Sequence, residues 1–387
     1  MIMIYLDNSA TTRLAPEVRA AMLEVWDNVG NPSSLHSAGL AAKKRLEGAR
    51  SSLIASAGLR SAEWQAVFCG SGSEANNLAL LGTAHERRHL DSKRILITDS
   101  EHASVSNTAE ALVSRGFELV NIPTNGGSLD LEAIEREAKK GICVASFMLV
   151  NNETGAIYDI ASAAEIIKKT CPSALIHCDA VQGFMRIPLP NSSKIDLISV
   201  SAHKIHGPSG VGALLLRRDL IKKRALCPVI FGGGQEEGLR SGTENLAGAV
   251  GFAKAAEIMK PRMNEYFDHL CDLSTYAIGK IEEAGAKVNI PPVRAPHILS
   301  ITLPRIKSQT MLNLLSAGGV CVSSGSACSS NAKNRHVSSA LVAFGLSDSE
   351  ADCTIRVSLC KDNTREEIDE FASLLSSGIQ RLVKTKR

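Results

Sequence analysis

The sequence predicts an α/β protein with a large, mostly parallel sheet and a second, smaller α/β part toward the C-terminal end. Short apolar runs of strand length alternate with helical patterns along the first two thirds of the chain, as in β-α-β units. Residues 142–150 form a long apolar run, as expected of a central strand buried on both faces. From about residue 256 the pattern becomes that of a smaller unit. We therefore expect a large domain over residues 15–255 and a small domain made of residues 1–14 and 256–387.

The composition is that of an ordinary soluble globular protein. Of the 387 residues, 44% are hydrophobic and 21% are charged, and the net charge of +3 is too balanced to indicate nucleic-acid binding. No apolar run reaches the roughly 18 residues that a membrane span requires. Residues 1–5 carry no basic segment and are followed by Asp7, so we expect a strand there rather than a signal peptide.

The ten cysteines contain no Cys-x-x-Cys pair, and this spacing indicates neither a disulfide framework nor a metal site. Cys143 and Cys178 lie in strand-like apolar runs, where a thiol behaves as a small hydrophobic group. We therefore expect a reducing, cytoplasmic location and no bound metal.

The elements can be assigned in order along the chain. A helix is expected to begin near Pro16, because proline is favoured in the first turn. Residues 30–34 form a loop by composition, and a helix rich in Ala, Lys and Arg is expected over about residues 40–57. The expected strands are residues 66–69, 94–98, 117–120, 142–150, 176–179, 196–198 and 210–216, with 297–301 in the smaller part.

Polar side chains follow several of these strands at the point where each strand ends. His102 comes after the strand at 94–98, Asn152 after 142–150, and Asp179 and Gln182 after 176–179. The carboxyl ends of parallel strands are where ligands bind in open α/β sheets, so these side chains should line one pocket. The alternative for His102 is a capping or solvated histidine.

The turn at Gly70–Asn76 joins a strand to a helix and contains Ser73. Small residues at such a turn let backbone N–H groups approach an anion. Because turns of this kind are common, the motif alone is weak. Together with Ser201 and His203, whose hydroxyl and imidazole also suit a phosphate, it predicts a phosphate-binding cup.

Lys204 lies in a polar turn between the strands at 196–198 and 210–216. An amine next to apolar strands is favoured in its neutral, nucleophilic form. A Schiff-base lysine combined with an aspartate for a pyridinium nitrogen, here Asp179, is the protein side of pyridoxal phosphate (PLP) chemistry. An isolated lysine in such a turn is more often a surface residue. The neighbouring Ser201 and His203, which suit a phosphate, favour the catalytic interpretation instead.

Residues 323–332 contain no large apolar residue, so we expect a mobile surface loop over about residues 323–335. Cys328 in this loop is not placed for packing, and an accessible thiol can ionise to the nucleophilic thiolate. The alternative is an incidental exposed cysteine. Cys321, between Val320 and Val322, is expected in the core.

Two further segments contain candidate residues. In residues 354–358, strand alternation places Arg356 on the polar face, where a guanidinium can bind a carboxylate bidentately; a surface ion pair is the alternative. Residues 231–243 are rich in glycine and end in Thr243, which predicts a flexible segment and would also fit a linker between lobes.

The motifs resemble those of the cysteine desulfurases, the NifS/IscS-like branch of the class V aminotransferase family. The resemblance extends over nearly the whole chain, and its motifs are Leu-Asp-Asn-Ser-Ala-Thr-Thr at 6–12, Ser-Ala-His-Lys at 201–204, Ser-Gly-Ser-Ala-Cys-Ser at 324–329 and Thr-Ile-Arg-Val-Ser-Leu at 354–359. It implies PLP-dependent transferase fold type I, with a mostly parallel seven-stranded sheet flanked by helices in the large domain.

The resemblance implies which residues bind PLP. Lys204 carries the cofactor, His102 stacks on its ring, and Asp179 binds the ring nitrogen. Asn152 and Gln182 contact the phenolic oxygen. The phosphate is bound by Ser73, Ser201 and His203, together with Thr243 of the neighbouring subunit in a homodimer.

The resemblance also implies the reaction. Arg356 and Asn152 bind the carboxylate of L-cysteine, Lys204 removes the Cα proton, and His102 assists proton transfers. Cys328 takes the sulfur as a persulfide, leaving L-alanine, and transfers it to an acceptor such as an iron–sulfur scaffold protein. No nucleic acid or membrane is expected as a direct partner.

Three alternatives stay open: a selenocysteine lyase, another class V PLP enzyme such as an aminotransferase, and an inactive PLP-binding assembly partner. Cys328 argues against the aminotransferase, which needs no thiol, and the joint presence of the catalytic residues argues against the inactive protein. The chain departs from the family at Ser209, where lysine is frequent, and at Cys360, where glycine is usual. We also expect no C-terminal extension of the kind with which IscS-type members bind the scaffold, so iron–sulfur assembly, tRNA thiolation and a dedicated pathway all stay open.

Overall fold

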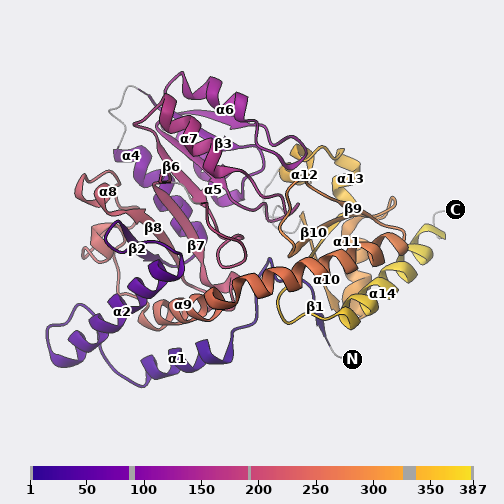
Figure 1. Ribbon diagram of the computed structural model, residues 1–387, viewed down its shortest axis with the longest axis horizontal. Coiled ribbons are helices and arrows are strands. Elements are labelled where there is room, and N and C mark those ends of the chain that lie inside the picture. Colours follow the sequence, from indigo (N-terminus) through magenta and orange to yellow (C-terminus); the bar gives the residue numbers. More distant parts are fainter. Residues whose placement is uncertain (1–2, 87–91, 191–192, 326–336, 385–387) are drawn as a thin grey trace.

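The computed structural model describes residues 3–86, 92–190, 193–325 and 337–384. These residues form a seven-stranded and a four-stranded sheet, each covered by helices, and a small two-stranded sheet (Figure 1). The prediction of an α/β fold is confirmed. The expected domain boundaries, 15–255 against 1–14 and 256–387, stay a prediction. Among the described residues, no helix is long and apolar enough to span a membrane.

The larger sheet has seven strands in the order β2-β8-β7-β6-β5-β3-β4. β8 runs antiparallel to both of its neighbours, and the other neighbouring pairs are parallel. The connection from β7 to β8 is short, which suits an antiparallel pair, whereas parallel neighbours need long crossovers. The strands are β2 Trp64–Cys69, β3 Arg94–Thr98, β4 Glu118–Ile122, β5 Val144–Met148, β6 Leu175–Asp179, β7 Leu197–Ser201 and β8 Gly212–Arg217.

Alternate residues of these strands enter two separate cores, one on each face of the sheet. In β3, Leu96 packs in one core while Ile95 and Ile97 pack in the other. Helices α1 Pro16–Trp26, α2 Ser37–Ser56, α6 Leu131–Ala138, α7 Ile160–Thr170 and α9 Leu246–Met259 cover the first core. Helices α3 Gly72–Asn77, α5 Ala103–Val113 and α8 Arg218–Lys222 cover the second, and α3 continues through a π-helical stretch, Leu78–Gly82, into α4 Thr83–Glu86.

The smaller sheet is antiparallel, in the order β12-β13-β10-β9, and its helices pack around their own core. β1 Ile4–Tyr5 pairs in parallel with β11 Val320–Cys321, so the start of the chain joins this part, and the expected strand is present. The remaining elements are β9 Lys287–Asn289, β10 Ile298–Thr302, β12 Ser323–Ser324, β13 Thr354–Ser358, α10 Met263–Glu283, α11 Ser308–Ala317, α12 Ser339–Ala343, α13 Asp348–Asp352 and α14 Arg365–Lys384.

Three expectations were wrong in part. Ser323 and Ser324 form a strand against β13, and Ser324 is buried, because ladder pairing requires no apolar side chain. The glycine-rich segment contains the buried Glu236, whose carboxylate lies 2.7 Å from the Arg50 guanidinium, so this part is fixed rather than flexible. Cys321 is only partly buried. Residues 326–336, including Cys328, lie outside the described residues.

Candidate active site

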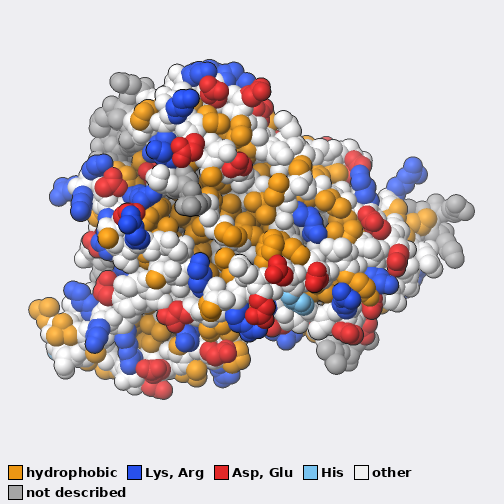
Figure 2. Space-filling model, in the orientation of Figure 1, with side chains coloured by type: hydrophobic (Ala, Val, Ile, Leu, Met, Phe, Trp, Pro, Cys, Tyr) orange, Lys and Arg blue, Asp and Glu red, His pale blue; other side chains and the backbone are white. Residues whose placement is uncertain are grey.

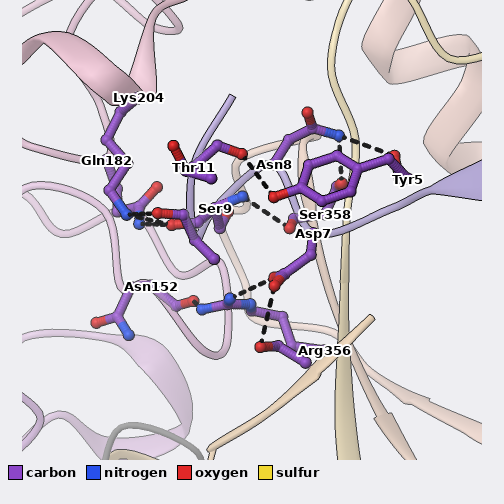
Figure 3. A network of polar contacts seen from close by, with 12 residues as sticks. Tyr5, Asp7, Asn8, Ser9, Thr11, Asn152, Gln182, Lys204, Arg356 and Ser358 are labelled. Carbon is purple, nitrogen blue, oxygen red and sulfur yellow. Dashed lines mark hydrogen bonds and ion pairs between the residues drawn. The ribbon is translucent and has the colours of Figure 1, made fainter. Parts of the chain in front are cut away.

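Lys204 lies in a 3₁₀ turn, Ala202–Lys204, directly after β7. Its Nζ donates to the backbone carbonyl of Ser9 and to that of Ala10 at 2.8 Å (Figure 3). The amine is therefore held at the junction between the C-terminal end of the large sheet and the N-terminal segment of the chain. The side chain is partly buried, as the turn between two apolar strands predicted.

Ser201 and His203 flank the same turn. The Ser201 hydroxyl is buried, and no hydrogen-bond partner is found for it in the described part of the chain. The His203 Nδ1 lies 3.2 Å from the Thr11 hydroxyl. Burial, with the nearby charge of Lys204, lowers the pKa of His203 to about 4, so its imidazole is neutral at neutral pH. An unpaired buried hydroxyl and a neutral imidazole both leave hydrogen-bonding capacity for a ligand.

The start of α3 lies against the end of β7. Ser71 caps the helix by accepting from the backbone N–H of Glu74 at 3.1 Å. A Cβ added at Gly72 would lie 2.7 Å from the Val181 Cγ2, so glycine permits the close approach of this turn to the segment after β6, and it would lie 3.4 Å from the Ser201 Cβ. Ser73 follows in the first turn and is exposed. The structure thus brings together the strand–helix turn and the Lys204 turn, as the predicted phosphate cup requires.

Asp179 ends β6 with its carboxylate buried. One oxygen accepts from the backbone N–H of Val181 at 3.0 Å, and the other accepts from the Asn76 amide at 2.7 Å. The same Asn76 amide nitrogen donates to the Ser104 hydroxyl at 2.8 Å, which lies 2.8 Å from the His102 Nδ1. A chain of hydrogen bonds therefore orients Asp179 and His102 together. Asn76 and Ser104 were not predicted as site residues.

His102 is the N-cap of α5. Its Nδ1 accepts from the backbone N–H of Ser104 at 3.1 Å, which places the proton of the neutral ring on Nε2. Burial lowers the pKa of His102, and Lys204 lowers it further, while the Asp179 carboxylate opposes the shift. His102 therefore caps a helix, as the alternative expected, and it also lies within electrostatic reach of Asp179 and Lys204, while its role against a cofactor ring stays a prediction.

Glu101, beside His102, was also missed. Its Oε1 accepts from the Thr98 hydroxyl at 2.7 Å and from the Met148 backbone N–H at 3.0 Å. No partner is found for Oε2 within the described residues. Burial, with a smaller contribution from the Asp179 charge, raises the pKa of Glu101 to about 8. The carboxyl is therefore protonated at neutral pH, and it ties the end of β3 to β5.

Gln182 faces the N-terminal segment. Its amide donates to the Ser9 carbonyl at 2.9 Å, beside Lys204 (Figure 3), and its oxygen accepts from Arg186 at 3.2 Å. The buried Arg186 also donates to the carbonyls of Lys204 at 2.7 Å and Asn8 at 3.0 Å. Burial lowers the pKa of Arg186 to about 10, so it stays charged. This arginine, which was not predicted, fixes the Lys204 turn against the N-terminal segment.

Arg356 projects from β13 toward the same segment. Its Nη2 pairs with the Asp7 carboxylate at 2.8 Å and its Nη1 donates to the Asn152 carbonyl at 2.9 Å, while the Asn152 side chain points away (Figure 3). The ion pair is present, but it is buried rather than on the surface. For the third donor, the buried Nε, no acceptor is found in the described structure. Arg356 therefore retains a donor for a carboxylate ligand, and Asp7 is a partner that was not predicted.

Residues 4–371 match the family described as Aminotransferase class-V. The chain belongs to this family. It is 37% identical over 390 residues to a protein named cysteine desulfurase IscS 1 from Archaeoglobus fulgidus, with 98% of each chain covered. It is 36% identical over 393 residues to a NifS/IcsS protein homolog from Lactobacillus delbrueckii subsp. bulgaricus, covering 99% of this chain and 98% of that one.

Solved structures agree with this class V assignment. A NifS-like protein superposes with a TM-score of 0.89 at 34% identity, covering 98% of this chain and 100% of the other. A NifS-like protein from Rickettsia africae gives 0.86 at 31% identity, covering 98% and 99%. The resemblance to NifS/IscS-like proteins and the fold class are confirmed, and membership of the family implies dependence on PLP in general.

The residues of this class V protein fit that cofactor. The buried Ser201 hydroxyl lacks a partner among the described residues, at the place where a phosphate was predicted. Asp179 presents a buried carboxylate oriented by neutral donors, which suits a protonated ring nitrogen. Lys204, His102 and Arg356 converge on the same region from different elements. The roles given to these residues stay predictions.

One predicted residue among those described is not brought into this cluster. Thr243 is exposed and lines a separate cavity of about 250 Å³, together with Gly70, Glu236 and Arg240. Its expected role in a neighbouring subunit stays a prediction. Cys328 lies outside the described residues, as noted above.

Proposed function

We propose that this protein is a cysteine desulfurase that takes sulfur from L-cysteine, releases L-alanine and carries the sulfur as a persulfide on Cys328. The observation that carries the proposal is the convergence of Lys204, Asp179, His102 and Arg356 at one end of the large sheet. Relatives that carry the name cysteine desulfurase over almost the full chain support it.

PLP would be held by Lys204, with Asp179 at the ring nitrogen and His102 against the ring. Ser73, Ser201 and His203 would bind its phosphate, and Asn152 and Gln182 its phenolic oxygen. When bound, PLP supplies a carbonyl carbon for amines and an electron sink for charge that develops at the substrate Cα. The Asn76 amide supports this arrangement, because it keeps the Asp179 carboxylate in place without neutralising it.

The chain's own groups perform the proton transfers. Lys204 Nζ takes the Cα proton, and the carbonyls of Ser9 and Ala10 orient the amine. Burial lowers the pKa of His102, which favours the neutral ring, and a neutral imidazole can accept a proton from a reacting group and return it.

Arg356 binds the carboxylate of L-cysteine. Its unpaired Nε supplies one donor, and charge-assisted hydrogen bonds to a buried guanidinium are strong. Ser323 of β12 pairs with Arg356 of β13 in the small sheet. The segment that precedes Cys328 in sequence therefore leaves this sheet next to Arg356, the residue proposed to bind the substrate carboxylate. This arrangement supports Cys328 as the group that attacks the substrate sulfur. The thiolate would form the new S–S bond as the Cβ–S bond breaks, and the electron pair of that bond would stay on the three-carbon fragment, which takes up a proton to become alanine.

A homodimer is part of the proposal, with Thr243 completing the phosphate site of the second subunit. Large apolar side chains lie exposed on the single chain, including Val29 at 91%, Leu35 at 90% and Phe231 at 78%. Figure 2 shows hydrophobic side chains at the lower-left tip of the molecule, where α1 connects to α2. A second copy would cover such residues, and light scattering of the purified protein tests this.

The acceptor of the sulfur would be a protein, such as an iron–sulfur scaffold or a tRNA-thiolating enzyme. The nine cysteines in the described part of the chain are free thiols, which supports work in the reducing cytoplasm.

The test is the yield of alanine and sulfide from L-cysteine with a thiol reductant. We expect equal yields from the wild type, loss of both in Lys204→Ala, and loss of sulfide in Cys328→Ala with its visible absorbance retained. Cys321→Ala, a partly buried thiol elsewhere, serves as the control and should stay active. Undiminished sulfide from Cys328→Ala would refute the assignment. PLP binding without sulfide from the wild type would favour selenocysteine as the substrate.

A further inference from the structure

Three side chains of metal-binding type lie together outside the groups described above. A ring nitrogen of His206, the Cys360 Sγ and a carboxylate oxygen of Asp362 are all within 4.8 Å of one another. His206 follows the Lys204 turn, whereas Cys360 and Asp362 follow β13. Because the ligands come from distant parts of the sequence, their spacing gave no motif, and the expectation of no metal was based on cysteine spacing alone.

His206 is prepared for coordination. It is buried, and its Nδ1 lies 3.1 Å from the backbone carbonyl of Arg13. A carbonyl can only accept, so Nδ1 carries the proton and the lone pair is on Nε2, which is how metal-binding histidines are commonly held. The backbone N–H of His206 also donates to the Thr12 hydroxyl at 2.7 Å.

Cys360 stands where the NifS/IscS-like branch usually has glycine, so its thiol is a feature of this chain. Its backbone N–H donates to the Asn363 side chain at 2.8 Å, which fixes the turn after β13. Burial raises the pKa of this thiol, so without a cation it holds its proton. A protonated thiol is a poor nucleophile, which argues against a second persulfide carrier. A metal ion would displace that proton to solvent.

Two cations oppose a metal at this place. The Lys361 amine pairs with one oxygen of Asp362 at 2.6 Å, and the charge of Arg186 acts on both His206 and Cys360. The pair with Lys361 is partly exposed, and exposed pairs contribute little to stability. The Lys361 amine also lies 5.8 Å from the centre of the Tyr266 ring. This cation–π contact can stabilise the amine when Asp362 binds a metal instead. The second oxygen of Asp362 remains for coordination.

We propose that His206, Cys360 and Asp362 bind a Zn²⁺ ion. One nitrogen, one thiolate and one carboxylate suit this ion, and the fourth position of a tetrahedral site would hold water. Ligand atoms around zinc lie about 3 to 4 Å apart, as expected from bond lengths near 2.0 to 2.3 Å. The three candidate ligand atoms, now within 4.8 Å of one another, would need to move only slightly closer to bind the ion. The ion would join the turn that holds Lys204 to the strand that holds Arg356.

The test uses the PLP-loaded enzyme in a Cys328→Ala background, so that this cysteine cannot bind the added metal. After treatment with a chelator, Zn²⁺ binding is measured by calorimetry. We expect one ion per chain, and an affinity at least about tenfold weaker in Cys360→Gly and in Asp362→Asn, a scale set by changes to ligand shells. Cys271→Ser, a partly buried thiol on α10, is the matched control and should bind as tightly as the parent.

A second readout keeps the result independent of folding and activity. Co²⁺ bound to a thiolate gives charge-transfer absorption in the near ultraviolet, read as the difference before and after the metal is added. This band should appear in the parent and in Cys271→Ser and vanish in Cys360→Gly. Zn²⁺ should also raise the melting temperature of the parent but not that of Asp362→Asn. Because Asp362 is exposed, its substitution should not disturb folding, so a missing shift would reflect a lost ligand. Unchanged Zn²⁺ affinity in both variants, or a cobalt band that persists in Cys360→Gly, would overturn the proposal.

Discussion

Replacing Glu101 by glutamine should change how the stability of the protein depends on pH. The carboxyl is fully buried, and burial raises its pKa from 4.5 to about 8. The folded state therefore keeps a proton that the unfolded chain releases. For such a group, the stabilisation is complete below the unfolded value and is lost as pH rises from 4.5 through about 8. Glutamine resembles the protonated acid and does not titrate.

The expected size follows from these two values. One pKa unit corresponds to about 1.4 kcal/mol. Between about pH 5 and about pH 8.5, the wild type should lose roughly 3 to 4 kcal/mol through this carboxyl, a loss that Glu101→Gln avoids. The substitution keeps the acceptor used by Thr98 and Met148 and places its NH₂ where Oε2 has no described partner. The unfolding free energy of Glu101→Gln, relative to that of the wild type, should therefore increase with pH.

The assay is urea unfolding at both pH values, with saturating PLP in every sample. Comparing each variant with wild type at the same pH cancels contributions from other titrating groups. Glu110→Gln, an exposed glutamate on α5, is the control and should show no growing difference. If the stability difference between Glu101→Gln and wild type changes by less than about 1 kcal/mol over this range, Glu101 is not protonated in the folded protein.

Three further results are expected. Arg50→Met should lower the unfolding free energy by about 3 to 5 kcal/mol in urea, because it leaves Glu236 buried and unpaired, and adding Glu236→Leu should restore most of the loss. Asn76→Ala should weaken PLP binding, titrated by visible absorbance, by roughly ten- to a hundredfold, since Asp179 loses a donor; unchanged affinity would contradict this. Arg356→Gln should raise KM for L-cysteine by roughly ten- to a hundredfold and affect kcat less; a change confined to kcat would contradict its role in binding.

The strands and the polar residues at their ends could be predicted because the information is local. Each strand is an apolar run, and a parallel sheet places the ends of its strands at one edge. His102, Asp179 and Lys204 were identified in this way, and the structure places His102 within electrostatic reach of both other residues. Sequence spacing was sufficient here because the sheet itself determines where these residues meet.

Other features depend on contacts between distant segments. The Asp7–Arg356 pair requires the N-terminal segment to lie against β13, and no local pattern indicates this. Arg50 lies in a helix rich in charged residues, so its burial against Glu236 could not be read from composition. Glu101 is adjacent to His102 in sequence, yet a carboxylate at a strand end is usually solvated. Its burial follows from the packing of β3 against β5.

The N-terminal segment also determines when this enzyme can be completed during synthesis. The Asn8 amide donates to the carbonyl of Ser358, 350 residues away, and the Ser358 N–H donates to the Leu6 carbonyl. At about 5 to 20 residues per second, roughly 20 to 70 s separate the translation of these partners. The segment that contains Ser9 and Ala10, whose carbonyls orient Lys204, therefore cannot make these contacts until the ribosome has synthesised the end of the chain. A nascent chain that is released early would have its large sheet but not a finished active site.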